Sequence, residues 1–73
     1  MKTLVAAFCY NALSNTNGMP RAEQADHFDL AGDILSLYDL KEMAAAARAA
    51  AADLRDAEAS QLKFQALLSS ALN

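Results

Sequence analysis

The sequence has few of the residues that interrupt helices or build specialised sites. Its 73 residues include one proline, two glycines, one cysteine, one histidine and no tryptophan. A single cysteine excludes a disulfide within these residues and a zinc site made of several cysteines. A single histidine excludes the paired-histidine spacings of zinc sites. With only three phenylalanines and two tyrosines, the apolar content is mostly leucine and alanine, and we expect a thin aliphatic core.

Basic charge is also scarce, because the net charge is −3 and the isoelectric point is about 4.7. A protein that grips nucleic-acid phosphates needs a basic patch, so we expect no direct contact with nucleic acid. No apolar run approaches the ~20 residues of a membrane span, and we expect no membrane partner. The 55% hydrophobic content is too high for disorder. A single small core is marginal at this length, so association into a homo-oligomer, a dimer, is expected.

The first 13 residues, "MKTLVAAFCYNAL", superficially look like a signal peptide. The apolar run after Lys2 is only about seven residues long and no small-x-small cleavage site follows, so we expect a cytoplasmic protein. Residues 2–13 could form a helix with Leu4 and Phe8 on one stripe, or a strand at about 2–10 with two apolar faces. A lone strand has no partner in this chain, which favours the helix.

The segment 14–19, within "SNTNGMP", predicts a loop, because serine, asparagine and glycine cluster there. Pro20 suits the first turn of a new helix over 20–38. Leu30, Ile34, Leu37 and Tyr38 would form its apolar face, with Ala31 and Leu35 beside them. Gly32 costs about 1 kcal/mol relative to alanine unless it permits close helix contact.

The residues "DLKE" (39–42) match a capping box with Asp39 as the N-cap of the next helix. No breaker follows, which favours one helix to about residue 72, with a second N-cap at Ser60 as the alternative. The expected fold is therefore all-α: a small single domain (1–73) whose long Ala-rich C-terminal helix (about 39–72) packs on one or two shorter N-terminal helices. The alternative is an α+β fold with the N-terminal strand.

Ten alanines lie between residues 42 and 60, in the middle of a predicted heptad seam. Its members recur in steps of three and four residues or their sums: Leu40, Met43, Ala47, Ala50, Leu54, Phe64 and Leu68. Alanine loses almost no side-chain entropy on ordering and lets two helix axes approach closely. The pattern predicts a packed seam, and the partner is either a helix of the same chain or a second copy.

An acidic row follows one side of the 20–38 helix: Glu23, Asp26, Asp29 and Asp33. No lysine or arginine occurs between residues 22 and 40, and carboxylates in a row repel one another. The row is a candidate partner-binding face for a larger protein with a basic nucleic-acid-binding surface. The alternative is a solvated face, favoured near a helix N-terminus. His27 diverges from its acidic neighbours on a helix, so we expect no metal and no cofactor.

A basic stripe recurs at intervals of seven, seven and eight residues: Lys41, Arg48, Arg55 and Lys63. It is interpreted as solvated surface that could also set the register with a partner. Cys9 lies between Phe8 and Tyr10, so a buried small residue is expected and not a nucleophile. No phosphate-binding glycine loop and no Ser–His–Asp pattern occurs, and we expect no catalytic residues and no enzyme.

These features together favour a small acidic interaction module, an inhibitor or adaptor that binds a larger protein. In general character only, with no shared motif, it resembles the short acidic helical accessory proteins of bacteriophages and mobile elements that block host defence machinery. A structural oligomerisation subunit is the alternative. A small transcriptional regulator is less well supported, because it would need a basic recognition helix.

Overall fold

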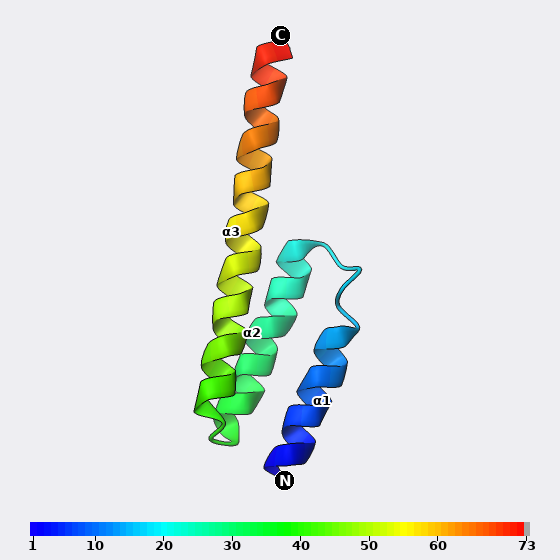
Figure 1. Cartoon of the computed structure of the whole chain (residues 1–73), viewed down its shortest axis with the longest axis vertical. Helices are drawn as coiled ribbons and strands as arrows, with labels where there is room; N and C mark the ends of the chain where they lie inside the picture. Colours follow the sequence, from blue (N-terminus) through cyan, green and yellow to red (C-terminus); the bar gives the residue numbers. More distant parts are fainter. Residues whose placement is uncertain (73) are drawn as a thin grey trace.

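The computed structural model describes residues 1–72, which form three α-helices: α1 (Lys2–Ser14), α2 (Arg21–Leu37) and α3 (Lys41–Leu72) (Figure 1). The expected all-α fold with a long C-terminal helix is confirmed, and α3 continues through Ser60 without a break. The N-terminal strand is not seen in the described chain. A helix satisfies its backbone hydrogen bonds internally, whereas a lone strand would leave them unpaired.

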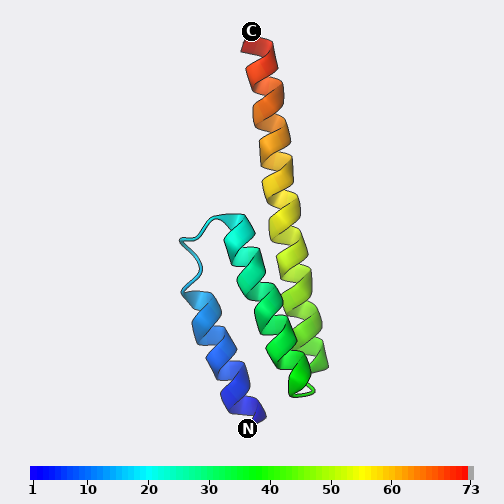
Figure 2. The ribbon, with the colours of Figure 1, turned by 180° about the vertical axis from the view of Figure 1, so that it is seen from behind.

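The three helices lie side by side, with α2 between α1 and α3 (Figures 1 and 2). Helices α2 and α3 form an antiparallel hairpin. At 1.5 Å per residue α3 is about 48 Å long and α2 is about 25 Å long, so the C-terminal part of α3 projects beyond the rest of the molecule. All residues from Ala59 to Leu72 are exposed, and α2 reaches this part of α3 only through Arg21, whose guanidinium donates to the Gln61 side-chain oxygen (2.8 Å).

The turn between α2 and α3 is closed by Asp39, which adopts a left-handed conformation with φ 62°. The Asp39 amide donates to the Ser36 carbonyl (3.1 Å), and the Leu40 amide donates to the Leu35 carbonyl (3.0 Å). These two bonds define a Schellman motif with Asp39 just past the end of α2. The prediction that Asp39 is the N-cap of α3 is wrong: Leu40 holds that place, and its carbonyl accepts the first bond of α3, from Ala44.

Small residues form the contact between α2 and α3. Ala25 and Ala51 are fully buried, and Gly32 is buried beside Ala44. A Cβ atom on Gly32 would lie 3.0 Å from the Arg48 Cγ and 3.4 Å from the Ala44 carbonyl oxygen. Glycine at position 32 therefore permits the two helices to approach closely, and this contact offsets its unfavourable helix propensity.

The face of α3 that packs on α2 is rotated from the predicted seam. Its buried residues are Ala44, Ala47 and Ala51, and Leu40, Ala50, Leu54 and Glu58 are half-buried. Leu40, Ala47 and Leu54 belong to both patterns, Ala44 and Ala51 lie in the contact in place of Met43, and Ala50 lies at its edge. Likewise α2 presents Ala25, Phe28, Gly32 and Leu35 to the interior, while Leu30, Leu37 and Tyr38 of the expected face are exposed. A close contact selects the smallest residues, and those lie on the neighbouring flank of each helix.

Helix α1 contributes only Val5 and Cys9 as buried residues, and these join Ala31 and Leu35 of α2 in one apolar cluster. The expected burial of Cys9 is observed at 4% exposure. The loop after α1 is anchored by Thr16, whose buried hydroxyl donates to the Leu13 carbonyl (2.7 Å). Leu13 of α1 is half-buried against this cluster, and Leu4, Phe8 and Tyr10 are exposed, so the core is thin, as the composition predicts.

Candidate interaction surfaces

Three of the four carboxylates in the acidic row are paired within the chain. Arg55 contacts Asp26 (2.9 Å) and Asp29 (2.6 Å), and Arg48 contacts Asp33 (3.1 Å). The hydrogen bonds that Arg55 donates, to Asp29 with the larger effect and to Asp26 with the smaller, raise the pKa of the Arg55 guanidinium above its usual value. The repulsion within the row is thus relieved by α3, so the row no longer requires a basic partner to explain it.

Glu23 differs from the other members of the row because it is exposed and has no ion pair among residues 1–72. Its binding role, and that of the whole row toward a larger protein, remains a prediction. Glu23 is the member whose substitution leaves the observed ion pairs intact.

The basic stripe sets the register between α2 and α3. Arg48 and Arg55 are seven residues apart, as are Asp33 and Asp26, so antiparallel helices bring both pairs together. The equal spacing of the two arginines and the two aspartates can be read from the sequence and indicates this pairing. Lys63 lies beyond α2 and has no ion pair within the described chain.

Three bulky members of the predicted seam are largely exposed, whereas Leu40 and Leu54 are half-buried against α2. Met43, Phe64 and Leu68 are 49%, 61% and 49% exposed, respectively. Past the end of α2, large apolar side chains on one side of α3 form what we call the distal face: Phe64, Leu67, Leu68 and Leu72. Soluble monomers rarely expose large contiguous apolar patches, and those that occur usually mark binding sites.

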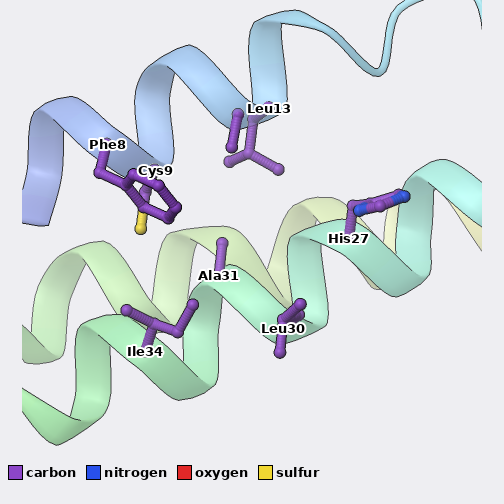
Figure 3. A pocket seen from close by; sticks show the side chains of 8 residues that line it. Phe8, Cys9, Leu13, His27, Leu30, Ala31 and Ile34 are labelled. Atoms are coloured by element: carbon purple, nitrogen blue, oxygen red, sulfur yellow. The ribbon is translucent and has the colours of Figure 1, made fainter.

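A groove of about 210 Å³ separates α1 from α2. Figure 3 shows Phe8 and Cys9 of α1 opposite Ile34 of α2, with His27 at the other end of the groove. The lining is almost wholly apolar, and His27 has no hydrogen-bond partner among the bonds found within residues 1–72. The groove can hold an apolar side chain, and nothing in it brings an acid, a base and a nucleophile together.

A second groove, of about 280 Å³, lies between α1 and α3 over α2. Tyr10 of α1, Phe28 of α2 and Met43 of α3 line it together with Ala46 and other apolar residues. Met43 and Ala46 are also the first residues of an uncovered stripe that continues along α3 towards the distal face.

Among residues 1–72, no helix is both long and apolar enough to cross a membrane, and no group of three or more metal-ligating side chains forms a candidate metal site. Comparison with protein-family models, with curated proteins and with solved structures found no match for this chain.

Proposed function

We propose that this chain is a small non-enzymatic protein–protein interaction module, an inhibitor or adaptor that binds a larger protein through the distal face. The observation that carries the proposal is the projection of α3 past α2, which leaves the four large apolar side chains of the distal face in solvent. Burying such side chains gives about 25 cal/mol per Å² of apolar surface. Within residues 1–72 these side chains stay exposed.

The chemistry of the distal face defines its partner. Lys63 is the only charged side chain between residues 59 and 72, so the matching surface is apolar with an acidic group beside it. Aromatic and leucine side chains at the centre with a charge at the edge are typical of interface anchors and rims. As an inhibitor the chain would cover a working surface of its partner, and as an adaptor it would tether the partner to a second protein.

The acidic row offers a second way to bind a protein, one with a basic nucleic-acid-binding surface. The pairing with Arg48 and Arg55 partly neutralises this face, which weakens its field. The distal face therefore has the better physical support.

A structural oligomerisation subunit is the alternative function. The observation in its favour is the shape of the molecule, which is 57 × 20 × 11 Å across its Cα atoms. Helices that lie in one thin layer bury apolar surface on few sides and usually need a second layer.

The proposal is tested by capturing partners from a bacterial lysate with tagged chain, followed by titration of the purified partner. We expect Phe64→Glu to abolish binding and Leu62→Glu, on the opposite side of the same helix turns, to have less effect. Glu23→Lys tests the acidic row without breaking an observed ion pair. Loss of binding in Glu23→Lys with full binding in Phe64→Glu would reject the distal face as the site.

A further inference from the structure

The described chain forms a single layer of helices. Helices α1 and α3 both pack on α2 (Figures 1 and 2), and the smallest Cα extent is 11 Å. Two packed layers of helices need about 13 Å or more between their outermost Cα atoms. A single layer leaves both of its faces open, and here the exposed large side chains lie mainly on α1 and along α3.

The exposed area gives the size of the missing contact. The accessible surface is 5337 Å², whereas a compact monomer of 7.8 kDa exposes about 4,400 Å². The excess of roughly 900 Å² is close to the ~800 Å² that each partner buries in a standard protein interface. The radius of gyration, 15.6 Å, also exceeds the roughly 11 Å expected for a compact chain of this length.

The uncovered apolar residues of α3 form a stripe in two parts, on either side of Gln61, which accepts a hydrogen bond from Arg21 of α2 (2.8 Å). What we call the open stripe consists of Met43, Ala46, Ala50, Ala57, Phe64 and Leu68, all exposed or half-buried. Its first half is mainly alanine and its distal half carries the large side chains. If two open stripes run antiparallel, the large side chains of each distal half pack on the alanines of the other copy. If they run parallel, large side chains meet large side chains, and these hold the alanine halves too far apart to touch.

The unpaired charges favour the same alignment. Within residues 1–72, Asp53, Asp56 and Glu58 have no ion pair, and neither does Lys63. In an antiparallel pair of α3 helices that cross near residue 60, each Lys63 lies beside the acidic segment 53–58 of the other copy. A parallel pair would instead bring lysine to lysine and acid to acid, which is unfavourable.

We propose that a second copy of this chain covers the open stripe from about residue 48 onward, with the two α3 helices antiparallel and crossing near residue 60. This inference rests on the distal face of the proposed function and differs from it in the occupant, which is a second copy of the chain in place of a larger protein. The end of each α3 then lies over the alanines of its partner, next to the groove between α1 and α3. The contact is the same patch on both copies, as two-fold symmetry requires.

The mass in solution tests the proposal. Light scattering and sedimentation of the full chain should give twice the 7.8 kDa of one copy. Phe64→Glu should raise the dissociation constant at least about thirtyfold, the effect of an interface hot spot. Leu62→Glu is the matched control, because Leu62 is 59% exposed against 61% for Phe64 and points to the other side of α3. Helical circular dichroism of both variants checks that each still folds.

The orientation is tested by charge reversal. Lys63→Glu should weaken the dimer several-fold, and adding Asp56→Lys in the same chain should restore it, because the two positions exchange partners across the two-fold axis. A dimer whose affinity is not restored by the second substitution contradicts the antiparallel arrangement.

The remaining outcomes separate this inference from the proposed function. A monomeric mass over about a hundredfold range of concentration overturns the second copy as the occupant. If Phe64→Glu then still abolishes capture of another protein, the interaction module stands and its distal face serves that protein. If neither the mass nor capture depends on Phe64, both proposals are rejected.

Discussion

Replacing Ala51 by leucine tests which face of α3 is packed. Ala51 has 0% exposure in the α2–α3 contact, as does Ala25 of α2. Leucine adds three carbon atoms where no space exists, and such overpacking costs about 1–3 kcal/mol. For a domain of this size, that lowers the melting temperature by about 4 to 24 °C.

The control is Ala52→Leu, because Ala52 is the next residue along the helix and is exposed. A surface change of this kind alters stability by about 0.5 kcal/mol or less. Thermal melts followed by far-ultraviolet circular dichroism at one protein concentration give both values. Equal melting temperatures for the two variants would refute the assignment of Ala51 to the buried face. Stability lost in Ala50→Leu but not in Ala51→Leu would instead place Ala50, and not Ala51, at the centre of the contact with α2.

Three further predictions concern the turn, the ion pairs and the glycine contact. Asp39→Gly should stabilise the fold by about 1 kcal/mol, because glycine adopts the left-handed conformation without strain; an unchanged urea midpoint would contradict this. Arg55→Gln should lower the urea midpoint and Lys2→Gln should not, and the difference should shrink in 1 M salt; a difference that persists in salt would argue against ion pairing. Gly32→Ala should gain the full ~1 kcal/mol of helix propensity only when Arg48→Ala removes the side chain that the new Cβ would meet. If the two substitutions changed the urea midpoint additively, the contact with Arg48 would be refuted.

The pH dependence of these ion pairs has a definite sign. The pKa of Arg55 is raised on folding by its hydrogen bonds to Asp29 and Asp26, so its contribution is fully present below the unfolded value and is lost only as pH rises beyond the folded one. That loss lies above the ordinary working range, because arginine stays charged there. Raising the pH across neutrality should therefore leave the Arg55 contribution unchanged, which urea midpoints at several pH values would check.

The sequence determined the helices. A chain with one proline, two glycines and a long alanine-rich segment has local preferences that select helix at almost every position, and the break at 14–19 follows from its turn residues. It also placed the acidic row and the basic stripe, since a helix turns 100° per residue regardless of its neighbours. The burial of Cys9 followed from its apolar surroundings.

Only the tertiary structure decided which faces meet. Met43 and Ala50 fit a heptad as well as Ala44 and Ala51 do, because both patterns contain Leu40, Ala47 and Leu54, and periodicity alone does not separate them. The choice follows from α2, whose Gly32 allows the closest approach on one flank and whose carboxylates lie within reach of Arg48 and Arg55. Asp39 likewise matched a capping box, but closing the hairpin requires a left-handed residue at that place. Helix formation depends on local backbone preferences, which one segment contains by itself. Which faces pack together depends on the side chains of both helices.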